Sequence, residues 1–120
     1  KSDIFTRYKD LYQQLDQILT QYKPQEAAIE TLFFSKNKTT ALRVSEARGI
    51  IIALALAHNC TIYEYSPVAI KQAVTGVGNA DKVAMAKMVG LQVPQSLHTE
   101  LDDAIDAVAA AITHSCTHAY

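Results

Sequence analysis

Only two short segments of this chain carry the pattern of a β-strand. Residues 26–33 join an apolar run to an acid, Glu30, and residues 61–65 alternate apolar and polar side chains and are rich in β-branched and aromatic residues. Apolar spacing and capping signals elsewhere predict five helices, over about residues 4–22, 40–59, 67–75, 80–90 and 99–114. The order helix, strand, helix, strand and three helices indicates an α/β layer protein.

Local signals predict where these helices begin and end. The expected N-caps are Ser2 or Asp3, Thr39 or Thr40, Ser66 before Pro67, and Asn79. Glycines are expected to end the third helix at Gly76 and the fourth at Gly90. The second helix is densely apolar over residues 50–57, so we expect it to be buried on more than one side.

The sheet is small for so many helices. A two-stranded pair is marginal by itself, and the chain starts with Lys1, not Met, directly on a helix. We therefore expect the natural protein to carry further strands before Lys1. Residues 1–120 should form a single partial domain, which is long enough to bury one core.

The charge of the chain is unevenly distributed. The net charge of −1 by itself argues against a nucleic-acid partner. Residues 31–99, however, hold more basic than acidic side chains, whereas residues 100–120 hold four acids and no Lys or Arg. The basic residues of the middle segment are Lys36, Lys38, Arg43, Arg48, Lys71, Lys82 and Lys87. This pattern fits a polyanion-binding surface beside a cation site, and ordinary charge fluctuation is the alternative.

Apolar runs and cysteines indicate the compartment. The longest apolar run, residues 49–57, is too short to cross a bilayer, so no membrane partner is expected. Two cysteines, Cys60 and Cys116, make a disulfide framework unexpected. We therefore expect a cytoplasmic protein. His114, Cys116 and His118 form a weak candidate zinc set at the end of the chain, without an evident fourth ligand.

Three carboxylates are the candidate catalytic and metal-binding residues. Glu30 ends a buried-looking strand, where α/β sheets place ligand sites, and a buried carboxylate is costly unless it meets a cation. Asp103 and Asp106 share one face of the last helix. If that helix packs near the strand end, the three converge into a site for Mg²⁺ or Mn²⁺, which prefer oxygen ligands and suit phosphodiester hydrolysis. The alternatives are a salt bridge from Glu30 to a lysine and aspartates that face water.

Aromatic and basic residues beside these acids are candidate DNA contacts. Phe33 and Phe34 follow Glu30 and point to opposite faces of an extended chain, so one of them could stack on an unpaired base while the other is core. Both being core is the alternative. Lys71 and Lys82 flank the turn at residues 76–78. We expect them to contact phosphate; the alternative is that both are solvated surface lysines.

Taken together, these motifs resemble the RuvC-type Holliday junction resolvases, which have an RNase H-like fold with a central mixed sheet flanked by helices. The matching stretches are "AIETLFFSKN", "ALRVSEARGIIIALA", "YSPVAIKQAVTGVGNADKVAMAKMV" and "LDDAIDAVAAAITH", in the family's order and spacing. The resemblance extends from about Ile4 to His114. It implies a structure-specific endonuclease that resolves Holliday junctions by paired, metal-dependent phosphodiester hydrolysis in recombination and repair.

The resemblance also implies roles for single residues. Glu30 matches the family's second catalytic carboxylate, and Asp103 and Asp106 match its pair on the C-terminal helix. Phe33, with Lys36 beside it, matches an aromatic that inserts near the junction crossover. Lys71 and Lys82 match basic residues that serve DNA contact and cleavage.

Partners follow from the same resemblance. It implies four-way junction DNA as substrate, a homodimer whose contact includes the helix at residues 40–58, Mg²⁺ or Mn²⁺ as cofactor, and a branch-migration motor complex as partner. The family's first strand, with its essential aspartate, has no counterpart in this sequence, so this chain is expected to be catalytically incomplete. A non-catalytic junction-binding module and a helical protein-interaction domain are therefore the alternative functions.

Overall fold

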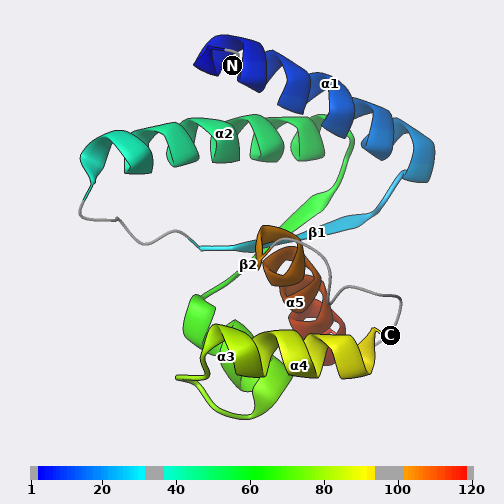
Figure 1. The fold of residues 1–120 in the computed structure, drawn as a ribbon. Helices are drawn as coiled ribbons and strands as arrows, with labels where there is room; N and C mark the ends of the chain where they lie inside the picture. Colours follow the sequence, from blue (N-terminus) through cyan, green and yellow to red (C-terminus); the bar gives the residue numbers. More distant parts are fainter. Residues whose placement is uncertain (1–2, 32–36, 94–101, 119–120) are drawn as a thin grey trace. The chain divides into compact units, whose positions relative to one another are not determined.

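The computed structural model describes residues 3–31, 37–93 and 102–118, and for residues 102–104 the backbone alone (Figure 1). Within these ranges the elements follow the predicted order of helices and strands. They are α1 (Ile4–Tyr22), β1 (Glu26–Glu30), α2 (Lys38–Ala57), β2 (Thr61–Tyr65), α3 (Pro67–Thr75), α4 (Lys82–Gln92) and α5 (Asp102–Thr117). The predicted α/β class is confirmed.

Several predicted ends are confirmed. Asp3, one of two candidates, caps α1 by accepting a 2.7 Å hydrogen bond from the Thr6 N–H. Ser66 caps α3, with Pro67 at its first position. Gly76 ends α3 in the left-handed conformation, with a φ of 81° that favours glycine.

Other predicted ends are wrong. Asn37 rather than a threonine caps α2, and Asp81 rather than Asn79 caps α4. Helix α4 passes through Gly90 to Gln92, because a helix interior tolerates a glycine that has no left-handed φ. Helix α5 also extends beyond the predicted end, to Thr117. Strand β1 ends at Glu30; the remainder of the predicted strand, from residue 32, lies outside the described residues.

The two strands form a parallel pair. The Thr61 N–H donates to the Gln25 carbonyl oxygen at 2.9 Å near one end, and the Thr31 N–H donates to the Tyr65 carbonyl oxygen at 2.8 Å at the other. The earlier residue of one strand therefore pairs with the earlier residue of the other, and the later with the later, which makes the two strands parallel. Of the central mixed sheet that was expected, the described residues form this one pair.

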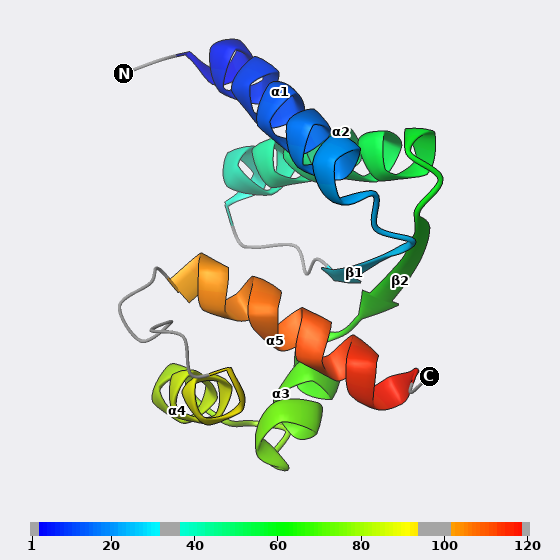
Figure 2. The same ribbon diagram turned by 90° about the vertical axis from the view of Figure 1, so that its right-hand side faces the viewer.

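The chain divides into two compact units, and both strands pass from one to the other. The first unit comprises Lys1–Ala27 and Leu32–Ile62. In it α1 packs against α2 (Figures 1 and 2), over a core of Leu19, Leu54, Ala55 and Cys60. Over residues 50–57 helix α2 is less buried than expected, since Leu56 is 56% exposed; Leu42, nearer its start, is 65% exposed.

The second unit comprises Ala28–Thr31 and Tyr63–Tyr120. Figure 2 shows α5 running across α3 and α4, which pack against each other and against α5. Val89 on α4 and Ala109 on α5 are fully buried in this core. That one domain spans residues 1–120 stays a prediction. None of the helices in the described ranges is both long enough and apolar enough to span a membrane.

Candidate active site

The second unit contains a pocket of about 380 Å³ whose walls come from β1, α3, α4 and α5. Its floor belongs to the hydrophobic core, because Ile70, Ala80, Met85 and Ile105 are all buried. Five ionisable side chains complete the lining: Glu30, Lys71, Asp81, Lys82 and Asp106. Four of these five are residues that the sequence singled out, so the fold gathers them from distant segments into one place.

Glu30 is the last residue of β1. The next residue, Thr31, is held by the hydrogen bond from its N–H to the Tyr65 carbonyl oxygen, so the strand pairing fixes the backbone on which Glu30 stands. The pocket walls partly desolvate the Glu30 carboxyl, and this raises its pKa above the ordinary glutamate value. The negative charge of Asp106 raises the pKa further, whereas the positive charge of Lys71 lowers it.

Asp106 lies on α5, directly after a residue that anchors the helix. Ile105 is buried, and so are Ala109 and Ala110 one turn later, so this side of α5 packs on the core. Asp106 itself is exposed and lines the pocket. Asp103 stands one turn earlier on the same helix, but its side chain is among those that the structure does not describe.

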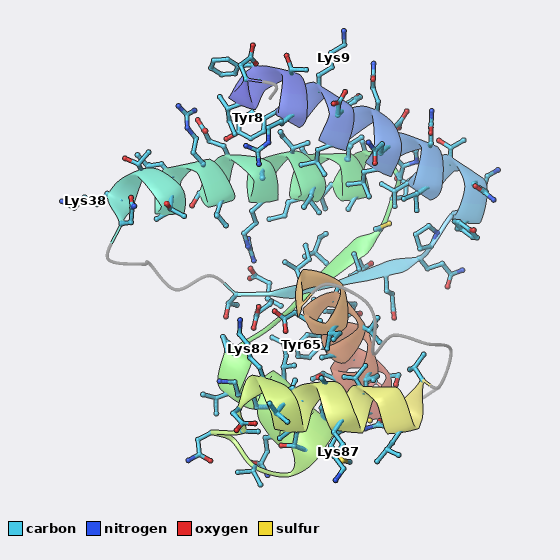
Figure 3. All side chains as sticks on the ribbon, in the orientation of Figure 1. Tyr8, Lys9, Lys38, Tyr65, Lys82 and Lys87 are labelled. Atoms are coloured by element: carbon cyan, nitrogen blue, oxygen red, sulfur yellow. The ribbon has the colours of Figure 1, made fainter. Side chains whose placement is uncertain are left out.

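Lys71 and Lys82 reach the same pocket from α3 and α4. Lys71 is half-buried, and its charge favours the ionised form of Glu30. Lys82 is the first residue of α4, and Figure 3 shows its side chain pointing to the opposite side of the helix from Lys87. The predicted pair of basic residues around the residue 76–78 turn therefore lies beside the carboxylates.

Asp81 is a pocket residue that the sequence reasoning missed. Its carboxylate accepts a 2.8 Å hydrogen bond from the Ala84 N–H, and its carbonyl oxygen accepts one from the Met85 N–H. It therefore positions the start of α4, and with it Lys82. Aspartate is among the preferred N-caps, so the signal was present, but Asn79 offered a competing one.

The described carboxylates suit a hard cation. Desolvation first and then the charge of Asp106 raise the pKa of Glu30, and a divalent ion bound between these two carboxylates would favour their ionised forms. Oxygen ligands of this kind are those that Mg²⁺ and Mn²⁺ prefer. Among the side chains that the structure describes, no group of three His, Cys, Asp or Glu residues has metal-binding geometry, and Asp103 is outside that set.

The remaining candidates stand elsewhere. Phe33 and Lys36 lie outside the described residues. His114 lies near the end of α5 and His118 directly follows this helix, with their ring centroids 4.8 Å apart, while Cys116 is exposed. In the part of the chain that is described, no third ligand joins them, so the weak zinc candidate gains no support.

Comparison with known proteins gives the family. Residues 1–114 match the family model described as "Crossover junction endodeoxyribonuclease RuvC". The protein of that name from Brachyspira hyodysenteriae is 48% identical over 109 residues, covering 91% of this chain and 67% of its own length. Its counterpart from Caldicellulosiruptor saccharolyticus is 45% identical over 108 residues, covering 90% of this chain and 65% of its own length. The chain thus spans about two thirds of these curated relatives.

Solved structures agree with the sequence match. The structure of Thermus thermophilus RuvC superposes with a TM-score of 0.82 at 27% identity, and that of T. thermophilus RuvC in complex with Holliday junction substrate with a TM-score of 0.87, also at 27% identity. Each alignment covers 95% of this chain and 69% of the other. The predicted RNase H-like fold is confirmed, and the chain belongs to the RuvC family of crossover junction endodeoxyribonucleases.

Proposed function

We propose that the protein resolves Holliday junctions by metal-dependent hydrolysis of phosphodiester bonds in recombination and repair. The observation that carries this proposal is the pocket in which Glu30 and Asp106 stand beside Lys71 and Lys82. Carboxylates that can hold a cation and lysines that can hold a phosphate are the two parts that such hydrolysis needs. The RuvC membership of the chain supports this reading.

Each pocket residue has a distinct part in the proposed reaction. Glu30 and Asp106 hold the cation, and Asp103, three residues before Asp106 in the sequence, joins them. Mg²⁺ or Mn²⁺ bound there would activate a water molecule and stabilise the leaving oxygen. Lys71, half-buried beside Glu30, and Lys82, held at the start of α4 by the Asp81 cap, neutralise and orient the phosphate.

The DNA substrate calls for contacts beyond this pocket. Phe33 and Lys36 follow Glu30 closely in the chain, and we assign them to the DNA beside the cleaved bond, the phenylalanine by stacking and the lysine by charge. A four-way junction is the proposed substrate because T. thermophilus RuvC has been solved with a Holliday junction substrate. A homodimer would bring two such sites to two opposing strands. A branch-migration motor as partner and a cytoplasmic location complete the proposal.

The test compares the intact protein on a labelled four-way junction and on a linear duplex of matching sequence, both in Mg²⁺. We expect paired, symmetric nicks on the junction alone, and their loss in Glu30→Gln. Asp10→Asn, which removes a carboxylate from the exposed surface of α1, is the matched control and should keep the nicks. Junction-selective binding without nicks would instead favour a non-catalytic junction-binding module. No preference for the junction would overturn the proposal and favour a helical interaction domain.

A further inference from the structure

We propose that Tyr65 and His114 are a positioning pair that sets the spacing between Glu30 and Asp106. The inference rests on the proposed function of their pocket, and it adds residues that touch neither metal nor substrate. Tyr65 is the last residue of β2, and His114 lies on α5 (Figure 3 labels Tyr65 beside this helix). Through its backbone carbonyl and its side-chain hydroxyl, Tyr65 connects the strand that carries Glu30 to the helix that carries Asp106.

The backbone of Tyr65 holds the Glu30 side. Its carbonyl oxygen accepts a 2.8 Å hydrogen bond from the Thr31 N–H and a 3.5 Å contact from the Thr31 hydroxyl. Thr31 directly follows Glu30, so these bonds fix the backbone at the point where the carboxylate leaves the strand. In the described part of the chain β1 pairs with β2 alone, so this end of β1 depends on Tyr65.

The side chain of Tyr65 holds the Asp106 side. Its hydroxyl lies 2.5 Å from Nδ1 of His114, with the two ring centroids 5.8 Å apart. His114 follows Asp106 by slightly more than two turns, a rise of about 12 Å along the helix. Ala109, Ala110 and Thr113 are buried between them, so this continuous stretch of α5 is anchored in the core. The hydrogen bond at His114 therefore also restrains the position of Asp106 on the same helix.

The His114 ring is itself held in place. The ring of Tyr63 lies with its centroid 4.6 Å from that of His114 and 4.7 Å from that of His118. These contacts limit rotation of the imidazole and keep Nδ1 directed at the Tyr65 hydroxyl. Tyr63 and Tyr65 thus contact the same histidine from the same strand, and it is the Tyr65 hydroxyl that forms the hydrogen bond to Nδ1.

Such a pair matters because ligand spacing determines cation affinity. A site works only when its ligands are held within about 0.5 Å of the required geometry. Loss of an outer hydrogen bond that orients metal ligands typically costs 10–100-fold in metal affinity. Glu30 and Asp106 come from different elements, so their separation depends on whatever joins those elements, and Tyr65 with His114 does so directly.

The test compares Tyr65→Phe with Tyr63→Phe. Each variant removes one hydroxyl from β2 and keeps its ring and backbone, so each should fold, as the unfolding midpoint will verify. Two measurements follow on the intact protein. The first is the side-chain carboxyl ¹³C chemical shifts of Glu30 and Asp106, recorded at one pH without metal. The second is the dissociation constant for Mn²⁺. His114→Asn, whose amide can still reach the Tyr65 hydroxyl, and His114→Leu complete the set.

The expected result is specific to one hydroxyl. Tyr65→Phe and His114→Leu should shift both carboxyl resonances and weaken Mn²⁺ binding by about tenfold, whereas Tyr63→Phe should match the wild type and His114→Asn should restore most of the affinity. Unchanged resonances in Tyr65→Phe would overturn the inference, as would an equal effect of Tyr63→Phe. If the wild type binds no Mn²⁺, the proposed function fails, and the metal-free resonances still decide whether the pair sets the spacing.

Discussion

Glu30 and Asp106, which are far apart in the sequence, line one pocket, where partial desolvation and then the charge of Asp106 raise the pKa of Glu30. The ionised pair is therefore held in place at a cost to the folded state. A divalent cation bound between the two carboxylates, as proposed above, would offset this cost. The same relationship makes the site testable through stability as well as through activity.

Replacement of Glu30 by Gln should change how the stability of the metal-free protein depends on pH. Because the pKa of Glu30 is raised on folding, the folded protein binds this proton more tightly than the unfolded chain does. The free energy of unfolding therefore falls as the pH rises from the ordinary glutamate pKa through the higher pKa that Glu30 has in the folded protein. Glu30→Gln, which stays neutral, should be more stable than the wild type above that window.

The measurement is the urea midpoint at several pH values in the presence of a chelator. The advantage of Glu30→Gln should disappear below the ordinary pKa of 4.5, where both side chains are neutral. An advantage that grew as the pH fell would contradict desolvation and the charge of Asp106 as the causes of the raised pKa of Glu30. Asp10→Asn serves as the control for the loss of a single negative charge, since Asp10 is exposed on α1 and is not among the residues that line the pocket.

Addition of Mn²⁺ should reverse the order of these two proteins. A ligand that binds only the folded state stabilises it by about 2.7 kcal/mol when its concentration is a hundred times the dissociation constant. The wild type should gain this amount, and Glu30→Gln should gain little at the same concentration, because one of its cation ligands is gone. Thermal unfolding with and without Mn²⁺ measures the difference. Equal stabilisation of both proteins would place the ion elsewhere.

Lys82→Gln should weaken junction binding and reduce its salt dependence. Each phosphate contact that is lost lowers the slope of log affinity against log salt concentration by roughly one. Lys87→Gln is the matched control, because Lys87 lies on the same helix, points to its opposite side in Figure 3 and does not line the pocket. Binding measured over a series of salt concentrations separates the two variants. A slope unchanged by Lys82→Gln would remove this lysine from the DNA contact.

Local signals explain which parts of the fold the sequence predicts. Ser66, Pro67 and Gly76 delimit α3 by backbone preferences that act within a few residues, and α1 and β2 were predicted with their observed bounds. The caps of α2 and α4 were misassigned, because each segment offers more than one capping residue and packing of the helix selects between them. Asn37 competes with the following threonines, and Asp81 competes with Asn79.

Tertiary contacts explain what the sequence does not predict. Glu30, Lys71, Lys82 and Asp106 were identified as candidates from residue type and spacing, but their common pocket depends on how α3, α4 and α5 pack. The bond between Tyr65 and His114 joins a strand to a helix late in the chain, and no periodicity links the two. The exposure of Leu42 and Leu56 likewise depends on what covers α2, which hydrophobicity alone cannot specify.

The fully buried alanine of α5 gives the last prediction, which connects packing to the site. Ala109 has no exposed surface and packs in the core with Val89, so α5 approaches its neighbours closely there. Ala109→Leu adds atoms for which there is no space, and overpacking of this kind costs about 1–3 kcal/mol of stability. We expect the helix to accommodate the leucine by moving outward, and Asp106, one turn away, to move with it. Mn²⁺ affinity should therefore fall together with the unfolding midpoint.

Ala111→Leu is the matched control, since Ala111 is exposed on the same helix and leucine is almost as good a helix former as alanine. It should leave the free energy of unfolding within about 0.5 kcal/mol of the wild type and the Mn²⁺ affinity unchanged. If Ala109→Leu lost stability but kept its Mn²⁺ affinity, the core would have absorbed the leucine without displacing α5. The position of Asp106 would then be set by bonds such as that of His114 to Tyr65 rather than by close packing of the helix.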